Sequence, residues 1–153
     1  MIFERSTTVG AQLEEVFAFF SDPRNLAKIT PPAMGFQIVS APDRALREGD
    51  RIEYRIKVLG LPLRWVTLIT SWRENESFSD FQEKGPYRHW LHTHSFRQSG
   101  KVVEMHDRVE YELPLGWLGQ LVAGWFIRMQ LNGIFDYRAQ AIHAAFGSES
   151  RLP

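Results

Sequence analysis

A helical periodicity continues for about 29 residues near the C-terminus, and it limits the possible folds more than any other pattern in the chain. It begins after Pro114 and lasts to about Phe146. At about 1.5 Å per residue, this helix would be about 43 Å long, enough to cross a whole sheet. Its apolar residues form a broad face that we expect to pack inside the protein. They are Leu118, Leu121, Val122, Trp125, Met129, Ile134, Phe135, Ile142 and Phe146.

The segment before this helix has a different periodicity. From about residue 36 to residue 112 the pattern has a period of two, with turn signals at intervals, which indicates antiparallel strands. Residues 52–58, for example, alternate between apolar and charged side chains, so one face of that strand is apolar. The period of two therefore predicts a sheet with one buried face.

The N-terminal part adds a strand and two short helices. Residues 2–9 are predicted to form the first strand, and apolar residues from Leu13 to Phe20 have the spacing of an amphipathic helix. Asp22 followed by Pro23 is a typical N-cap and first helical position, which predicts a second short helix.

These elements predict an α+β fold. A curved antiparallel sheet of about six to seven strands wraps on the long C-terminal helix, and two short helices follow the first strand. We expect one domain over residues 1–147 and a disordered tail over residues 148–153. A strongly curved sheet around a helix encloses space, which either side chains or a ligand must fill.

The composition excludes several classes of function. The 18 basic residues are matched by 18 acidic residues, so a nucleic-acid partner is not expected. The chain has no cysteine, which excludes disulfides and thiolate metal sites. The N-terminus does not resemble a secretion signal, and the apolar stretch 113–129 is too short and interrupted for a membrane span. We therefore expect a cytoplasmic monomer or homodimer without stable membrane insertion.

Polar side chains are predicted to interrupt the apolar face of the sheet. If Ser99–Gly100 is a two-residue turn, His92 lies opposite Asp107 and His94 lies opposite Met105. Asp107 then occupies the apolar face of its strand. A buried carboxylate needs a partner, and the His92 imidazole is close enough to provide one.

The preceding strand extends this polar cluster. It places Asp80 and Gln82 on one side, and this side is shared with His92 if the loop at Gly85–Pro86 has an odd number of residues. The predicted polar cluster consists of Asp80, Gln82, His92, His94 and Asp107, among Trp90, Phe96 and Tyr111.

Two sequence segments resemble a known superfamily. The run FSDFQEKGPYRHWLHTHSF, followed by MHDRVEYELPLGWLG, resembles the SRPBCC or START-like superfamily, which includes birch-pollen-allergen-like proteins, polyketide cyclases and lipid-transfer domains. More narrowly, it is similar to a bacterial ligand-binding branch of unknown function. The resemblance implies a helix-grip fold over about residues 1–147 and a hydrophobic cavity.

The leading functional hypothesis is that the chain binds a small hydrophobic molecule between the sheet and the long helix. Lipid, polyketide and isoprenoid-like compounds are the ligand classes considered. The candidate ligand-binding residues are Tyr54, Asp80, Gln82, Trp90, His92, His94, Asp107, Tyr111, Trp125 and Met129.

Two alternatives stay open. The first is an enzyme of the cyclase, dehydratase or aromatase type, in which His92 acts as acid–base and Asp107 orients it. The second is a lipid- or protein-interaction module that uses the segment from Gly116 to Trp125.

The histidines also raise the question of a metal. His92 and His94 project from one face of a strand, as zinc ligands can, and Asp107 or Asp80 could be a third ligand. A hydrogen-bonded buried network without an ion is the favoured interpretation, so the sequence leads us to expect neither a metal nor a cofactor.

Overall fold

The computed structural model describes residues 1–58 and 60–147, so the tail expected at 148–153 lies outside the described residues. Its seven strands form one antiparallel sheet in the order β1-β7-β6-β5-β4-β3-β2. The predicted α+β fold class is confirmed. In chain order the elements are β1 (Ile2–Val9), α1 (Leu13–Ser21), the 3₁₀ helices η1 (Pro23–Ile29) and η2 (Pro32–Met34), β2 (Gln37–Ser40), β3 (Arg51–Val58), β4 (Leu61–Arg73), β5 (Ser77–Lys84), β6 (His89–Ser99), β7 (Val102–Glu112) and α2 (Gly116–Phe146).

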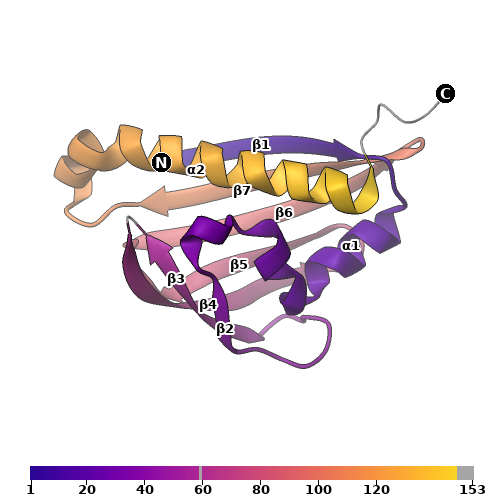
Figure 1. Cartoon of the computed structure of the whole chain (residues 1–153), viewed down its shortest axis with the longest axis horizontal. Coiled ribbons are helices and arrows are strands. Elements are labelled where there is room, and N and C mark those ends of the chain that lie inside the picture. The colour runs from indigo at the N-terminus through magenta and orange to yellow at the C-terminus, as the bar shows by residue number, and fades with distance from the viewer. Residues whose placement is uncertain (59, 148–153) are drawn as a thin grey trace.

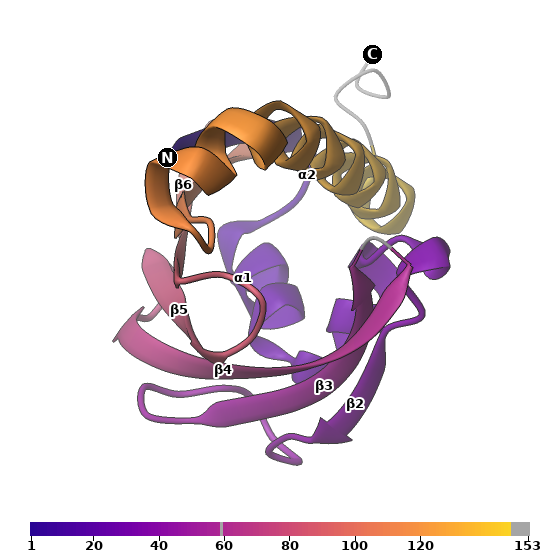
Figure 2. The ribbon, with the colours of Figure 1, turned by 90° about the vertical axis from the view of Figure 1, so that its left-hand side faces the viewer.

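The sheet is strongly curved, and α2 lies across its open side. Figure 1 shows α2 running alongside β1 and β7, with α1 at one end of the sheet. In the end-on view of Figure 2, β2 to β5 curl away from α2, so the sheet is open on the side where the helix lies. The short helices α1 and η1 follow β1, as predicted, and pack against the curved sheet.

The core consists of three separate clusters of buried side chains. The first joins α1 to β5, β6 and β7 around Phe17 and Phe96. The second joins α2 to β1 and β7 around Phe3 and Leu131. The third lies around Ile52 between β3 and β4. Leu26 and Trp72 pack against both the first and the third cluster and so connect them.

Two of the short helices, α1 and η1, begin with defined hydrogen bonds. At η1, Asp22 accepts a hydrogen bond from the backbone N–H of Arg24 (2.9 Å) and Pro23 is the first helical residue, which confirms the predicted cap. At α1 the cap comes from a distant strand, because the backbone N–H of Leu13 donates to Oε1 of Gln98 on β6 (2.9 Å). The β6–β7 hairpin therefore fixes the start of α1.

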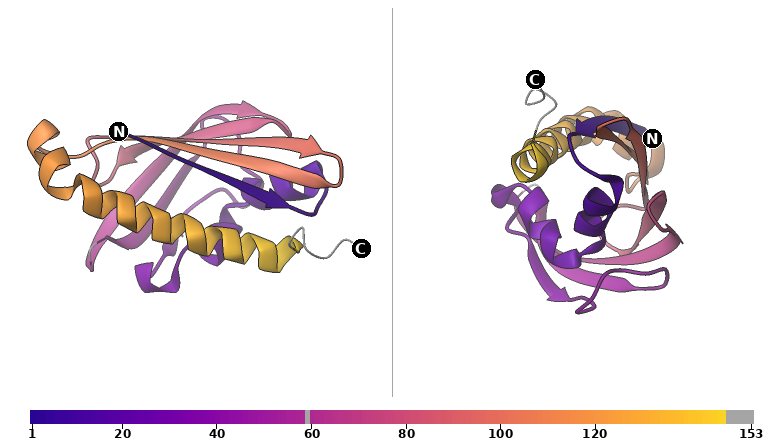
Figure 3. Two further views of the ribbon diagram at one scale, coloured as in Figure 1. Left: turned by 90° about the horizontal axis from the view of Figure 1, so that it is seen from above. Right: turned by 90° about the vertical axis from the view of Figure 1, so that its right-hand side faces the viewer.

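The inward face of α2 differs from the prediction. Its buried residues are Gly124, Ile127, Leu131, Phe135 and Ile142. Most residues at the start of the expected apolar face are exposed: Leu118, Leu121, Val122, Trp125 and Met129 have exposed fractions of 48% or more. The first turns of α2 extend beyond the end of the strands (Figure 3). The prediction was wrong for these residues because the early part of the helix is apolar on almost every side, so its periodicity does not indicate which side meets the sheet.

The turn of the β6–β7 hairpin also differs from the prediction. Ser99 pairs with Val102, so the turn residues are Gly100 and Lys101 instead of Ser99 and Gly100. Gly100 has a φ of 61° at the first turn position, where type II′ turns favour glycine. The register is therefore shifted by two residues, and His94, not His92, lies directly opposite Asp107. A shift of two leaves every side chain on its predicted face.

Two glycines of α2 should respond oppositely to substitution by alanine. A Cβ at Gly133 would have no neighbour within 4 Å, whereas a Cβ at Gly119 would lie 2.0 Å from the backbone oxygen of Pro114. We expect Gly133→Ala to raise the free energy of unfolding by about 0.5–1 kcal/mol, because alanine loses less backbone entropy in a helix. Gly119→Ala should lower it by about 1–3 kcal/mol through overpacking. Urea denaturation measures both changes, and equal effects at the two positions would contradict the close approach at Gly119.

The length of α2 does not make it a membrane span. Within residues 1–58 and 60–147, no helix combines sufficient length with sufficient apolarity to cross a bilayer.

Candidate functional site

A cavity of about 150 Å³ lies where the three core clusters meet. Each cluster contributes to its wall, with Phe78 from the first, Phe135 from the second and Ile52 from the third. Most of the wall is apolar. The polar side chains in it come from the inner face of the sheet, from α2, and from Thr30 and Tyr87 in connecting segments.

Three polar residues of the cavity wall form a compact cluster with a fourth, Asp107, on β5, β6 and β7. We call these four residues, Asp80, His92, His94 and Asp107, the His–Asp cluster. Cross-strand pairing brings them together, because Asp80 lies opposite His92 and His94 lies opposite Asp107. The two imidazole rings are 3.8 Å apart between centroids. Both histidines are buried, with exposed fractions of 5% and 6%.

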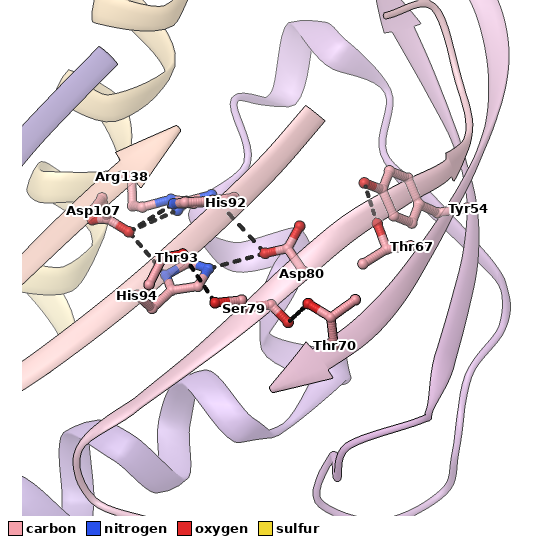
Figure 4. A network of polar contacts seen from close by, with 10 residues as sticks. All are labelled: Tyr54, Thr67, Thr70, Ser79, Asp80, His92, Thr93, His94, Asp107 and Arg138. Carbon is pink, nitrogen blue, oxygen red and sulfur yellow. Dashed lines mark hydrogen bonds and ion pairs between the residues drawn. The ribbon is translucent and has the colours of Figure 1, made fainter. Parts of the chain in front are cut away.

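The two carboxylates lie on opposite sides of the histidine pair (Figure 4). On one side, Oδ1 of Asp107 lies 2.9 Å from Nε2 of His92 and 2.8 Å from Nδ1 of His94. On the other side, Oδ2 of Asp80 lies 3.2 Å from Nε2 of His94 and 3.6 Å from Nδ1 of His92. The contacts at 2.9 Å and 3.2 Å are hydrogen bonds, whereas the N–H direction of His94 Nδ1 is not well aligned with Asp107.

Arg138 on α2 brings one positive charge next to the His–Asp cluster. Its Nη1 atom lies 3.8 Å from Oδ1 of Asp107, and its guanidinium packs 4.8 Å from the centre of the Phe135 ring. Nε and Nη1 of Arg138 are buried and find no acceptor within residues 1–58 and 60–147. Arg138 is one of the residues that line the cavity, and its guanidinium can act only as a hydrogen-bond donor.

Burial and the carboxylates shift the pKa values of the two histidines in opposite directions. Burial and the neighbouring His94 lower the pKa of His92. Burial acts in the same direction on His94, but its contacts with Asp107 and Asp80 outweigh it and raise its pKa. In Asp107, burial favours the neutral form, but the two histidines outweigh this effect and hold the pKa well below its usual value. His94 and His92 also outweigh burial at Asp80 and lower its pKa, so both carboxylates of the cluster favour the ionised form.

The cluster also has the composition of a metal site. Among the described residues, Asp80, His92 and His94 each offer one ligand atom, and these atoms all lie within 4.8 Å of one another. Imidazole nitrogens and a carboxylate oxygen form a ligand set that suits divalent transition metals.

The candidate residues named from the sequence occupy three kinds of position. Tyr54, Asp80, Trp90, His92 and His94 line the cavity. Gln82, Asp107 and Tyr111 are buried outside its lining. Trp125 and Met129 lie on the exposed side of α2, away from the cavity, so the structure does not bring them to the site.

Gln82 has a local contact that explains its burial. Its side chain donates to the backbone oxygen of Tyr87 (2.8 Å) and accepts from the backbone N–H of Tyr87 (3.3 Å). It thus holds the loop between β5 and β6, and Tyr87 on this loop lines the cavity.

Sequence reasoning missed Arg138 and Trp65, which both line the cavity. Arg138 does carry a signal, since it lies three residues after Phe135 and four before Ile142, on the buried stripe of α2. A charged residue on such a stripe indicates a buried polar contact. Trp65 has no comparable signal, because large aromatic residues on a strand are mostly core residues.

Comparison with known proteins agrees with this architecture. Residues 9–135 match the protein family described as polyketide cyclase / dehydrase and lipid transport. The chain belongs to this family. Membership confirms the SRPBCC or START-like resemblance seen in the sequence, and it implies a ligand-binding cavity. No curated protein shows significant sequence similarity to this member of the family.

Solved structures share the fold of this polyketide cyclase family member at low sequence identity. A protein from Arthrobacter aurescens has a TM-score of 0.73 at 14% identity, over 99% of this chain and 92% of that chain. A START superfamily protein from Mycobacterium smegmatis has a TM-score of 0.68 at 13% identity, over 95% and 96%. The di-domain ARO/CYC protein BexL has a TM-score of 0.69 at 20% identity, over 94% of this chain and 45% of that chain. These similarities confirm the helix-grip fold.

Proposed function

We propose that this protein binds a small, mainly apolar molecule with at least one polar group in the cavity between the sheet and α2. The observation that carries the proposal is an unfilled apolar cavity with buried polar groups in its wall. Nε1 of Trp65 and the Nε and Nη1 atoms of Arg138 are buried and have no acceptor among the described residues. An unpaired buried donor costs about 1–3 kcal/mol. Trp65 and Arg138 both line the cavity, so a ligand acceptor that a small side-chain shift brings within reach of such a donor would relieve this cost.

The size of the cavity narrows the ligand class. A cavity of this volume, about 150 Å³, is known to hold a benzene-sized molecule when its walls are apolar. A compound with a single ring therefore fits better than an extended lipid or a polycyclic polyketide. The polar end of such a compound would face the wall that contains Asp80, His92 and Arg138.

The proposal predicts that single-ring compounds stabilise the protein. Each of three single-ring probes is added to protein treated with EDTA. Toluene has no polar group, phenol carries a hydroxyl, and benzoate carries a carboxylate, so the series compares an apolar probe with two polar ones. At least one should raise the melting temperature in a concentration-dependent way, equivalent to about 2.7 kcal/mol at 100 times its Kd. A thermal unfolding series measures the effect. A melting temperature that none of the three probes raises would overturn the proposal.

A matched pair of variants locates the binding. Ile134 lines the cavity from α2, whereas Leu121 on the same helix is 76% exposed. Ile134→Trp should fill the cavity and abolish the stabilisation, and Leu121→Trp should leave it unchanged. Equal stabilisation of the two variants would show that the probes bind elsewhere.

Acid–base catalysis is a second candidate, and the contact between His92 and Asp107 favours it. With Nε2 of His92 held by Asp107 at 2.9 Å, the ring is oriented and Nδ1 is directed away from that carboxylate. An oriented imidazole in a cavity wall could move a proton on a bound hydroxyl or carbonyl compound. Conversion of a bound compound that His92→Gln abolishes would support catalysis, whereas release of the compound unchanged supports binding alone.

A further inference from the structure

The three polar atoms that converge at the cavity wall have the spacing of a metal coordination shell. Oδ2 of Asp80 lies 3.2 Å from Nε2 of His94 and 3.6 Å from Nδ1 of His92. With Zn–N and Zn–O bonds of about 2.0–2.2 Å, ligand atoms of a tetrahedral shell are about 3.4 Å apart. The two separations lie on either side of this value, and all three ligand atoms lie within 4.8 Å of one another, so Asp80 is placed to share an ion with each histidine.

The remaining nitrogen of each histidine is directed to a second carboxylate. Nε2 of His92 and Nδ1 of His94 lie 2.9 Å and 2.8 Å from Oδ1 of Asp107, which is only 2% exposed. Histidine ligands of metals usually donate their other N–H to a carboxylate, which fixes the tautomer and the ring orientation. Here Oδ1 of Asp107 lies next to one nitrogen of each ring, and the other two nitrogens, His92 Nδ1 and His94 Nε2, face Asp80 (Figure 4).

The position of these residues in the sheet makes the arrangement rigid. Asp80, His92 and His94 come from the paired strands β5 and β6, and Asp107 comes from the next strand, β7. None of the four lies in a loop. A metal site on paired strands is preorganised, because strand pairing holds its ligands before the ion binds.

The local charge also favours a cation. With neutral histidines, the carboxylates of Asp80 and Asp107 carry two negative charges and Arg138 carries one positive charge. The cluster is then one unit negative in a buried environment. A divalent cation reverses this sign and leaves one positive charge, which an anionic oxygen in the cavity would neutralise.

We propose that Asp80, His92 and His94 bind one divalent transition-metal ion such as Zn²⁺, with Asp107 orienting the two imidazoles. The sequence favoured an ion-free network, but it could not show that the second nitrogens of both rings reach one shared carboxylate. Three protein ligands leave at least one coordination position open. Asp80, His92 and His94 all line the cavity, so this position faces the proposed ligand site.

A titration with Zn²⁺ tests the site directly. Full-length protein is stripped with EDTA, exchanged into chelator-free buffer and titrated with ZnCl₂ in a calorimeter, with MgCl₂ as the comparison ion. We expect one Zn²⁺ per chain with a Kd in the micromolar range or below, and no comparable binding of Mg²⁺, which prefers oxygen ligands. Absence of Zn²⁺ binding by the wild-type protein overturns the proposal, and the cluster is then a hydrogen-bonded network only.

Single substitutions distinguish Zn²⁺ binding at the His–Asp cluster from Zn²⁺ binding by histidines on the surface. Asp80→Asn and His94→Gln should each weaken Zn²⁺ binding at least 100-fold, and Asp107→Asn should weaken it about 10–100-fold, as expected for a residue that orients metal ligands. His106→Gln, outside the cluster on the exposed face of β7, is the matched control and should bind Zn²⁺ like the wild type. Binding that falls in His106→Gln and persists in His94→Gln contradicts the assignment.

Two further measurements keep the outcome clear. Circular dichroism shows whether each variant is folded before the titration, and Co²⁺ added to the wild-type protein should give visible absorption bands that Zn²⁺ displaces. The metal site does not depend on the proposed organic ligand. The thermal series with toluene, phenol and benzoate is carried out in EDTA, so either proposal can fail while the other stands.

Discussion

Asp107→Ala should lower the free energy of unfolding of the EDTA-treated protein by about 3–5 kcal/mol, because removing one partner of a buried charge network leaves the others uncompensated. Asp107 is 2% exposed and lies within 3.8 Å of nitrogen atoms of His92, His94 and Arg138. None of these groups can turn to bulk water without breaking the packing around it. Urea denaturation at neutral pH measures the change.

Two control variants separate the buried charge from the rest of β7. Asp107→Asn keeps the shape but removes the charge, so its cost should be smaller, about 1–3 kcal/mol. Glu110→Gln removes a carboxylate from the same strand, where Glu110 is about half exposed and pairs with Arg108 at the surface. A surface pair contributes about 0–1 kcal/mol, so this variant should remain close to the wild type. A similar cost for Asp107→Ala and Glu110→Gln would show that the network contributes little to stability.

Phe17→Ala should also lower the free energy of unfolding by about 3–5 kcal/mol, as expected for removal of a fully buried aromatic ring. Phe17 is 1% exposed and makes edge contacts with Trp72, Phe78 and Phe96, whose ring centres are 5.2 to 6.0 Å away. Together with Val16 and Phe20, it packs α1 on the sheet. Its loss should leave a cavity, because rings held by three different strands cannot all move inward. Urea denaturation followed by tryptophan fluorescence measures the change, since Trp72 is one of the neighbours.

The matched control for this variant is Phe126→Ala. Phe126 is also on a helix, but it is 39% exposed. Its removal should change the free energy of unfolding by about 0.5 kcal/mol or less, because surface substitutions away from special contacts have small effects. If the two variants lost similar stability, helix propensity and not packing would explain the loss at Phe17.

Much of the fold was predictable because the spacing of apolar residues in a segment indicates whether it forms a helix or a strand. The alternation in residues 52–58 predicted β3, and the long helical period predicted α2. The Asp22–Pro23 pair predicted the start of η1, since a cap depends only on neighbouring residues. Local patterns did not indicate which side of α2 faces the sheet, because the first half of this helix is apolar on most sides.

The candidate site was predictable only in part. Parity along β6 and β7 predicted that His92, His94 and Asp107 share one face, and this holds although the predicted hairpin register was wrong by two residues. The sequence placed Asp80 on this face only on the condition of an odd loop at Gly85–Pro86, and the structure pairs Asp80 with His92. Which histidine lies opposite Asp107 depended on the turn position, which the sequence analysis placed at Ser99–Gly100 and the structure places at Gly100–Lys101. Arg138 reaches the same site from a helix about 30 residues later in the chain, so no strand pattern could include it.

The sequence by itself determined the order of elements, the curved sheet on a long helix, and the side of the sheet on which the histidines and carboxylates lie. Only the tertiary structure decided that one carboxylate contacts both imidazoles, that Arg138 joins them, and that Trp125 and Met129 lie outside the cavity. The reason is physical. Periodicity is set by the backbone of one segment, whereas these contacts depend on how α2 is rotated and placed against the sheet, which many weak packing contacts decide together.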